Sequence, residues 1–400
     1  MNRKEIKYYI LSSILIVVVG FGIIELTTRT VSWLSGKGFT LSLHELEPYA
    51  KKVEKLYQWH PFTGITFTPN NIFQGGHPSQ KERSLIVVDN HSFLSNVPFL
   101  EYQKSPNEIR IATIGASTTA SINLSYDENW PGYLGTLVQN ALPAKKIRVI
   151  NAGVPGFDTA QSIGNLALRV IPFSPDVVII YHAYNDLKAI RKNVTFEPDY
   201  SHIHTKPYGF HKKPNFVIRV LDHSMFYVRL RQQYRDYNQQ VQKVEELKNE
   251  RQGKSNRLNE IPQQAREAFE QHIRTLVSIA KAQGAYVILS SFVTLNNPKL
   301  DYSNPEVFKQ LSKLQKGELY ALMHFTPGLT VKAIFEGINS YNEILRKIAF
   351  QEKIGWVDNA SLIPHEDKYF VDRVHFSREG AARMANNLFQ EVWEQLQQFQ

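Results

Sequence analysis

The feature that most constrains the fold of this 400-residue chain is an alternation, from residue 109 onward, of short apolar runs with segments of helical length. The runs are rich in β-branched residues and end in glycine or polar residues, which is typical of buried strands. Strands separated by helices indicate a parallel sheet with right-handed crossovers. The expected strands lie at 109–117, 147–151, 176–182, 285–292 and 355–360, and the expected helices at 130–142, 159–170, 265–283 and 338–352.

Distinctive residues stand at the ends of the first three expected strands. Ser117 ends the first in a tight Gly-Ala-Ser turn, Gly153 follows the second in NAGVPGFDT, and Asn185 follows the third in YHAYNDL. Ligands of parallel sheets bind beyond the carboxyl ends of the strands. Ser117 is therefore a candidate nucleophile, and the Gly153 N–H and the Asn185 amide are candidate donors to an oxyanion. The alternative for Ser117 is a simple turn or a phosphate-binding loop. For Gly153 it is an ordinary loop glycine, and for Asn185 a helix N-cap.

An Asp-x-x-His element, DRVHFSREG, precedes the expected last helix. A serine hydroxyl needs a base whose pKa lies near neutrality, and histidine supplies one. A carboxylate beside the histidine fixes its tautomer and stabilises the imidazolium. Asp372 and His375 are thus candidates for orienting group and base. The alternative is a surface turn in which Ser377 caps the helix.

In this order along the chain, the four elements resemble those of the SGNH hydrolase family, also called GDSL esterases. The resemblance runs from Ile109 to the C-terminus, apart from two insertions. It implies a flavodoxin-like three-layer α/β/α sandwich with a mainly parallel sheet. The site residues that it implies are a catalytic triad of Ser117, Asp372 and His375 and an oxyanion hole of Ser117, Gly153 and Asn185.

Two positions depart from the family pattern. The usual Gly-Asp-Ser is here Gly115-Ala116-Ser117, and the usual glycine before the Asn motif is Ala183. The first change removes a carboxylate that is not a triad member, so we expect activity to survive. The second lies two residues from Asn185 and is expected to affect substrate size. The segments at 59–70 and 87–93 resemble the N-terminal part of membrane-anchored bacterial members.

The N-terminus contains an uncharged apolar run from Tyr8 to Ile24. This length approaches the ~20 residues that cross a bilayer. Arg3, Lys4 and Lys7 precede the run, which predicts a cytoplasmic N-terminus and an extracytoplasmic remainder. The residues after Ile24 make a poor cleavage site, so we expect a retained signal anchor rather than a cleaved peptide. A buried core helix is the alternative.

We expect three parts in the chain. Residues 1–29 form the cytoplasmic tip and transmembrane anchor, 30–105 a stalk and a small β-rich segment, and 106–400 the catalytic domain with insertions near 193–260 and 293–330. Trp59 and Phe62 are expected in the core of the β-rich segment, with a substrate-facing position as the alternative. The first insertion is a candidate for binding lipid headgroups or an anionic polymer, and the second for a lid. Solvated surface is the alternative for both.

Composition excludes several classes of site. The chain has no cysteine, which excludes disulfides, thiolate catalysis and cysteine zinc sites. Its net charge is +9, and residues 201–260 hold 12 Lys or Arg against 6 Asp or Glu. No nucleic-acid motif accompanies this charge, so we expect no nucleic-acid partner. The other histidines lack metal-ligand spacing, and neither a metal nor a cofactor is expected.

These features predict a membrane-anchored serine esterase that hydrolyses carboxylic esters, with O-acetyl or short acyl groups on envelope carbohydrate or lipid as substrates. Two alternatives use the same chain differently. An O-acyltransferase would use the same triad to pass the acyl group to a polysaccharide hydroxyl. A non-catalytic binding or scaffold protein would not depend on Ser117.

Overall fold

A computed structural model of the protein describes residues 3–35, 39, 56–77, 80, 83–204, 221, 223–231, 233, 234, 237 and 256–397. Contacts divide the chain into two compact units. The first comprises Met1–Lys55 and Gly209–Glu245, and the second Leu56–Tyr208 and Glu246–Gln400. Residues 40–55 of the expected stalk, the aromatic and basic stretch at 207–216, and the Gln-rich segment up to 252 lie outside the described residues.

A five-stranded parallel sheet forms the centre of the second unit. Its strands are β5 (Glu108–Gly115), β6 (Lys146–Asn151), β7 (Val177–Tyr181), β8 (Tyr286–Ser290) and β9 (Gly355–Val357), in the spatial order β6-β5-β7-β8-β9. This order is that of flavodoxin-like folds, so the predicted fold class is confirmed. In such a sheet the ligand crevice opens where the winding reverses, here between the carboxyl ends of β5 and β7.

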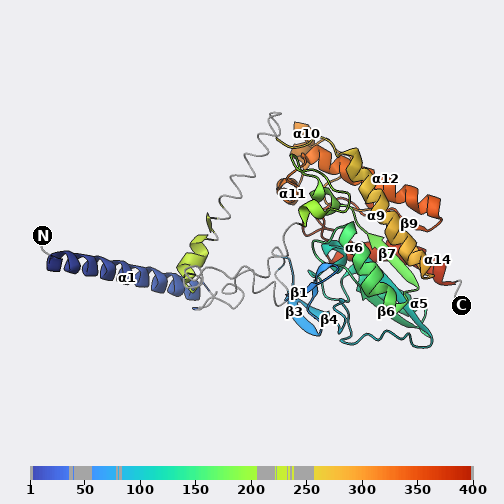
Figure 1. The fold of residues 1–400 in the computed structure, drawn as a ribbon, viewed down its shortest axis with the longest axis horizontal. Helices are drawn as coiled ribbons and strands as arrows, with labels where there is room; N and C mark the ends of the chain where they lie inside the picture. The colour runs from blue at the N-terminus through green and yellow to red at the C-terminus, as the bar shows by residue number, and fades with distance from the viewer. Residues whose placement is uncertain are drawn as a thin grey trace. The chain divides into compact units, whose positions relative to one another are not determined.

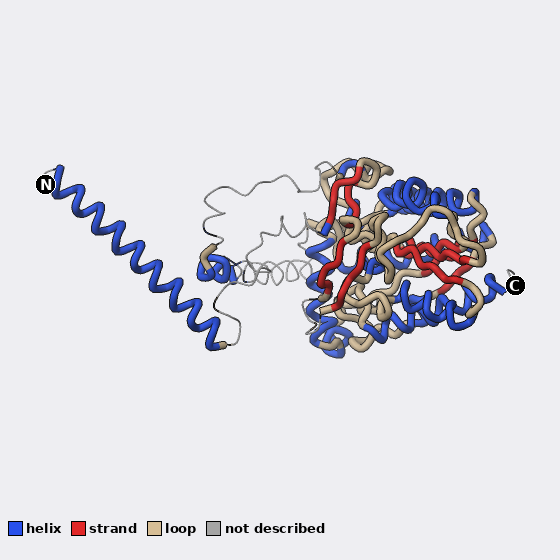
Figure 2. The backbone as a smooth tube through the Cα atoms, turned by 90° about the horizontal axis from the view of Figure 1, so that it is seen from below, coloured by secondary structure: helices blue, strands red, loops and turns tan. Residues whose placement is uncertain are grey.

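Helices cover both faces of this sheet (Figure 1; Figure 2). On one face, α5 (Trp130–Ala141) packs against α14 (Arg378–Leu396). On the other face lie α6 (Thr159–Asn165), α9 (Gln263–Ala282) and α12 (Val331–Glu352). The apolar sides of these helices and both faces of the buried strands form one continuous core. The three-layer sandwich therefore matches the sequence prediction.

Several element boundaries differ from those predicted. The first strand ends at Gly115, and Ser117 instead opens the short helix α4 (Ser117–Ala120). Helix α12 begins at Val331 because the Thr330 side chain accepts from the Ala333 N–H. The last strand stops at Val357 and is followed by α13 (Asn359–Leu362). The other helical elements of this unit are η1 (Leu166–Val170), η2 (Ile171–Phe173), η3 (Asp186–Ala189), η4 (Ser201–Ile203), α10 (Pro305–Gln310) and α11 (Lys313–Phe325).

Two antiparallel hairpins precede the sheet. They are β1 (Tyr57–His60) with β2 (Gly64–Phe67), and β3 (Asn71–Gly75) with β4 (Ser84–Val88). Leu94 bridges both Val88 and Asn151, which joins the second hairpin to β6 at the sheet edge. The expected core positions of Trp59 and Phe62 are wrong, because these side chains are 60% and 68% exposed.

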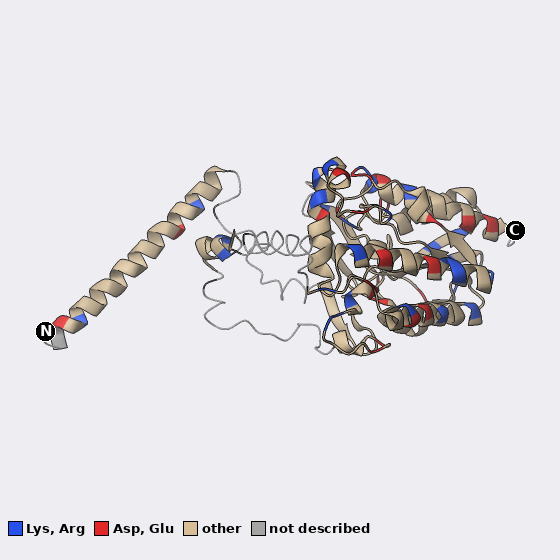
Figure 3. Ribbon diagram, turned by 90° about the horizontal axis from the view of Figure 1, so that it is seen from above, with Lys and Arg blue, Asp and Glu red and all other residues tan. Residues whose placement is uncertain are grey.

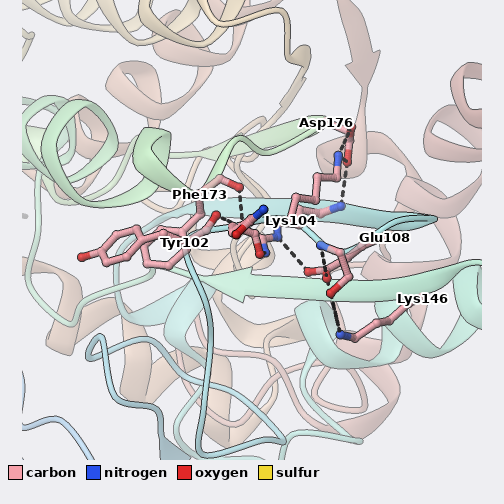
Figure 4. Close-up of polar contacts among 9 residues, drawn as sticks. Tyr102, Lys104, Glu108, Lys146, Phe173 and Asp176 are labelled. Carbon is pink, nitrogen blue, oxygen red and sulfur yellow. Dashed lines mark hydrogen bonds and ion pairs between the residues drawn. The ribbon is translucent and has the colours of Figure 1, made fainter.

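A buried ionic cluster anchors the amino end of β5, away from the strand end that carries Ser117 (Figure 4). The Arg110 guanidinium donates to Glu108 Oε1 at 2.8 Å and to the carbonyls of Tyr102 and Phe173 at 3.0 and 2.8 Å. Lys104 binds Asp176, which also accepts from the Arg110 N–H at 2.7 Å. Because every buried charge has a partner, this cluster ties the preceding loop to β5 without leaving a charge unpaired.

In the first unit, α1 (Arg3–Leu34) is the only described helix long and apolar enough to cross a membrane. Charged residues lie near its two ends, with an uncharged stretch between them (Figure 3). Near its C-terminal end, Glu25 accepts hydrogen bonds from the Ser224 hydroxyl and the N–H groups of Met225 and Phe226, at 2.7 to 3.0 Å. Part of the first insertion therefore packs on α1.

Candidate active site

The turn after β5 presents Ser117 and is closely packed from two sides. A Cβ atom at Gly115 would collide with the Thr119 hydroxyl, and one at Gly153 would collide with the Ala120 N–H. Both positions therefore require glycine on steric grounds. The turn is closed by hydrogen bonds from the Ala120 N–H to Ala116 and from the Asn151 amide to the Thr119 carbonyl, at 2.8 and 3.1 Å.

Ser117 and Asn185 line one small pocket at the crevice between β5 and β7. Its volume is about 10 Å³, which is room for about one water molecule. Aromatic side chains wall the pocket, since Tyr181 and Phe292 stack at a ring-centroid distance of 4.8 Å. Val374, next to His375, lines the same pocket. The structure thus brings the Ser117 and Asn185 elements together with the loop that carries the Asp-x-x-His element.

Asp372 and His375 form a hydrogen-bonded pair. His375 Nδ1 lies 2.7 Å from Asp372 Oδ2, and the other carboxylate oxygen accepts the N–H groups of Val374 and His375 at 2.9 and 2.8 Å. Asp372 is buried, whereas the His375 side chain is 22% exposed. The arrangement holds the His375 ring by Nδ1 and leaves Nε2 as the nitrogen that can exchange protons with a substrate.

The carboxylate of this pair is held in its ionised form. Burial acts to raise the pKa of Asp372, but the charge and hydrogen bond of His375, a hydrogen bond from His77 and the charge of Arg373 together hold the pKa well below its usual range. An ionised Asp372 can accept the Nδ1–H of His375 and stabilise an imidazolium.

Hydrogen bonds, an ion pair and a ring contact fix the loop that carries the pair. The Asn123 amide donates to the Phe376 carbonyl at 2.9 Å and so ties the loop to the segment after Ser117. The Leu295 N–H donates to the Arg373 carbonyl at 2.9 Å. The Arg373 guanidinium binds Glu318 of α11 at 3.2 Å, the Tyr184 hydroxyl at 3.2 Å, and lies 3.9 Å from the Phe325 ring centroid. The second insertion therefore supports this loop.

The expected oxyanion donors differ in whether their N–H groups already have hydrogen-bond acceptors. One Asn185 N–H donates to the Phe157 carbonyl at 2.8 Å, which leaves its second amide hydrogen for another acceptor. The Gly153 N–H donates to Asn151 Oδ1 at 3.1 Å, and Gly153 does not line the small pocket. Among the described residues, no hydrogen bond joins the Ser117 hydroxyl to His375.

Sequence reasoning missed several residues that shape the site. Asn151, Asn123 and Arg373 lie in or near the motifs, yet nothing in their spacing indicated which groups they would bind. His77 comes from the loop after β3, and its Nε2 lies 3.4 Å from Asp372 Oδ2. No local pattern could have found His77, because its partner lies 295 residues further along the chain.

A polar groove borders the Asp372–His375 loop. Its volume is about 520 Å³, and Gln80, Asn123 and Ser377 are among its lining residues. The other lining residues are Arg83, Ser84, Leu85, Leu124, Ser125, Glu128, Arg378 and Glu379. The lining therefore offers hydroxyl, amide, carboxylate and guanidinium groups of both charges. Within the described residues, no group of three or more His, Asp or Glu side chains could hold a metal ion.

Comparisons with known proteins identify the family. No curated protein matches the chain. Among solved structures, a variant of an acetyl xylan esterase from Geobacillus stearothermophilus is 16% identical over 73% of this chain and 97% of its own, with a TM-score of 0.40. A GDSL-like lipase from Bacteroides thetaiotaomicron is 13% identical over 75% of this chain and 93% of its own, with a TM-score of 0.37.

The model of the GDSL-like lipase/acylhydrolase family matches residues 113–383, which is more than half of the chain. The match includes Ser117, Gly153, Asn185, Asp372 and His375. The chain therefore belongs to the GDSL-like lipase/acylhydrolase family and is a carboxylic ester hydrolase of the SGNH type.

Proposed function

We propose that this protein is a membrane-anchored serine esterase that removes acetyl or other short acyl groups from a polar alcohol, with envelope carbohydrate as the substrate class. The observation that carries the proposal is the Asp372–His375 pair, joined at 2.7 Å on a loop that shares a pocket with Ser117. In this reaction the pair supplies the base that the hydroxyl of Ser117 needs.

The chemistry follows from these three side chains. Ser117 Oγ attacks the ester carbonyl carbon while His375 Nε2 takes the hydroxyl proton. Asp372 stabilises the resulting imidazolium through the Nδ1–H bond. The C–O bond to the alcohol then breaks, and His375 returns the proton to the leaving oxygen. His375 then deprotonates a water molecule, which attacks the carbonyl carbon of the acyl-serine. The bond from this carbon to Ser117 Oγ breaks, His375 returns the proton to Oγ, and the carboxylic acid leaves.

The Ser117 hydroxyl is not yet bonded to His375 in the described state. Catalytic hydrogen bonds are often long or misaligned without substrate and form in the substrate complex. The negative carbonyl oxygen would receive the Ser117 N–H and the second Asn185 amide hydrogen. Gly153 is the third donor of this hypothesis, and its N–H would have to be shared with or released from Asn151, which it binds at 3.1 Å.

The dimensions of the site favour a small acyl group and a polar alcohol. The pocket beside Ser117 is only about 10 Å³ in volume, and its walls are bulky aromatic rings. A long acyl chain would have to displace them. The groove beside the His375 loop is far larger, about 520 Å³, and is lined mainly by hydrogen-bonding groups. Such a lining suits the hydroxyl groups of a carbohydrate.

Anchoring to a membrane is supported by α1. Within its candidate span, Glu5–Leu34, an 18-residue window has a mean hydropathy of 2.4. Arg3, Lys4 and Lys7 stand before the apolar run, so the proposed orientation has the N-terminus in the cytoplasm and the esterase outside it. A catalytic unit held beside the envelope would meet acylated polymers at high local concentration.

Hydrolysis of p-nitrophenyl acetate, butyrate and octanoate by the full chain in detergent tests the proposal. We expect the acetate to react fastest, and Ser117→Ala to lower kcat by about 10⁴-fold and abolish labelling by a fluorophosphonate probe. Ser278→Ala, an exposed serine on α9, serves as the matched control and should retain full activity. Equal turnover by Ser117→Ala would overturn the serine mechanism, and a preference for octanoate would overturn the short-acyl assignment.

A further inference from the structure

One histidine beside the candidate active site comes from outside the family domain. His77 lies in the loop between β3 and β4, whereas the family match begins at residue 113. Its Nε2 lies 3.4 Å from Asp372 Oδ2, the same oxygen that binds His375 Nδ1 at 2.7 Å. The side chain of His77 is 24% exposed, while that of Asp372 is 7% exposed. The N-terminal hairpin thus reaches the carboxylate of the candidate triad.

The surrounding backbone is built for this close approach. A Cβ atom at Gly75 would collide with the Ile122 carbonyl, which lies shortly after the Ser117 turn. Gly76 adopts a positive φ of 146°, a conformation that other residues rarely adopt. The Gln80 side chain accepts the His77 N–H at 2.8 Å. Two glycines and one side-chain hydrogen bond therefore hold the His77 backbone against the site.

We propose that His77 is a positioning residue of the esterase, which donates its Nε2–H to Asp372 and so orients the carboxylate toward His375. This inference rests on the proposed function, because it assigns Asp372 the role of orienting the catalytic base. Asp372 Oδ1 is already held by two backbone N–H groups. His77 supplies the second donor to Oδ2, so both carboxylate oxygens are fixed from two sides.

The contact has a defined electrostatic consequence. The charged or titratable groups around Asp372 are His375, His77, Arg373 and Tyr184. A donor from His77 draws negative charge on Oδ2 away from the His375 bond. Removing that donor leaves the oxygen to His375 alone, which favours the imidazolium. The ion pair between Asp372 and a protonated His375 should therefore strengthen when His77 is lost, although the His375 ring becomes less well oriented.

Replacing His77 by side chains of different length separates this role from simple packing. The contact is made by Nε2, whose place the amide nitrogen of glutamine can occupy, whereas the shorter asparagine cannot reach it. In the full chain, we expect His77→Ala and His77→Asn to lower kcat about 10-fold with little change in KM, and His77→Gln to restore kcat to within about 3-fold of wild type. The exposed His223, changed to Ala, is the control and should have no effect.

The pH profile of kcat/KM supplies a second readout. Its acidic limb should move to higher pH in His77→Ala and return in His77→Gln. A residue that only stabilises the hairpin would lower the unfolding temperature without moving this limb. Unchanged kcat and an unchanged limb in folded His77→Ala would overturn the proposal. If His77→Ala fails to fold, the comparison of His77→Gln with His77→Asn decides.

A spectroscopic measurement keeps this inference separate from the proposed function. The proton between His375 Nδ1 and Asp372 should give a low-field ¹H resonance that is lost in His375→Ala. We expect this resonance to shift in His77→Ala and to return in His77→Gln. If Ser117→Ala retained full activity, the proposed function would fail, and this shift would still test the contact. A resonance whose chemical shift is the same in all His77 variants as in wild type would overturn the inference.

Discussion

At the scale of single residues, the partners of a buried carboxylate decide its charge. Asp89 and Asp372 are both buried. Burial raises the pKa of Asp89 to about 6, although hydrogen bonds from the Phe93 and His91 N–H groups and the charge of Arg169 act against it. For Asp372 burial acts in the same direction, but adjacent cationic groups and imidazole donors prevail. The two aspartates therefore suit different tasks: Asp89 shapes a turn, and Asp372 carries charge.

The raised pKa of Asp89 predicts a pH-dependent stability. An unfolded Asp titrates near pH 3.9, whereas the folded group titrates at about 6. Between these values the folded state retains a proton that the unfolded state has lost, so stability falls as pH rises. Asp89→Asn keeps the acceptor oxygen and does not titrate. Between pH 4 and pH 7, we expect the free energy of unfolding of Asp89→Asn to rise by about 2 to 3 kcal/mol relative to that of wild type.

Urea unfolding of both proteins at several pH values measures this difference. A constant difference across the range would show that Asp89 does not titrate with a raised pKa. The direction is opposite to that of the usual salt-bridged aspartate, whose contribution to stability is lost on acidification.

At the scale of elements, the turn after β5 depends on how closely β6 and its loop approach it. Gly153 packs on the backbone of α4, and Gly115 packs on Thr119 and on the Tyr181 carbonyl of β7. Three adjacent strand ends are therefore interlocked around Ser117. A glycine in such a place is required by contact with another element rather than by a positive φ.

Gly153→Ala should consequently displace α4. The added methyl group meets the backbone at Ala120, which cannot rotate away as a side chain can. Overpacking of this kind costs about 1 to 3 kcal/mol, and we expect kcat to fall more than 10-fold because Ser117 moves with α4. Chemical denaturation and labelling by the fluorophosphonate probe measure the two effects. Gly317→Ala, where α11 leaves open space, is the control and should keep full labelling with no loss of stability. Wild-type labelling in folded Gly153→Ala would contradict this role.

At the scale of the whole molecule, a contact distant in sequence organises the first unit. Glu25 of α1 accepts hydrogen bonds from the backbone N–H groups of Met225 and Phe226. The Phe21 ring lies edge-on to the Phe226 ring at a centroid distance of 6.4 Å. A carboxylate at a helix N-terminus satisfies donors that have no partner within the helix. Part of the insertion that interrupts the alternation of strands and helices therefore packs on the N-terminal helix.

This contact can be tested by crosslinking, because the chain has no cysteine of its own. Phe21→Cys with Phe226→Cys should be joined by a short bifunctional maleimide in the full-length protein, and peptide mass spectrometry detects the product. Adding Glu25→Ala should reduce its yield about 10-fold, since the loss of several hydrogen bonds to a carboxylate costs at least ~1.4 kcal/mol. Leu15→Cys with Phe226→Cys is the distance control. Equal yields from both pairs would contradict the packing.

By itself, the sequence determined the parallel sheet, its helices and the strand-end residues, because hydrophobic periodicity and turn residues are local properties of the chain. It also indicated the Asp372–His375 pair, whose members lie within one turn. The tertiary structure alone decided that His77 joins this pair, that the Gly153 N–H is engaged by Asn151, and that an insertion packs on α1. Each of these contacts depends on where the fold brings groups together and on competition between hydrogen-bond partners, which no spacing along the chain records.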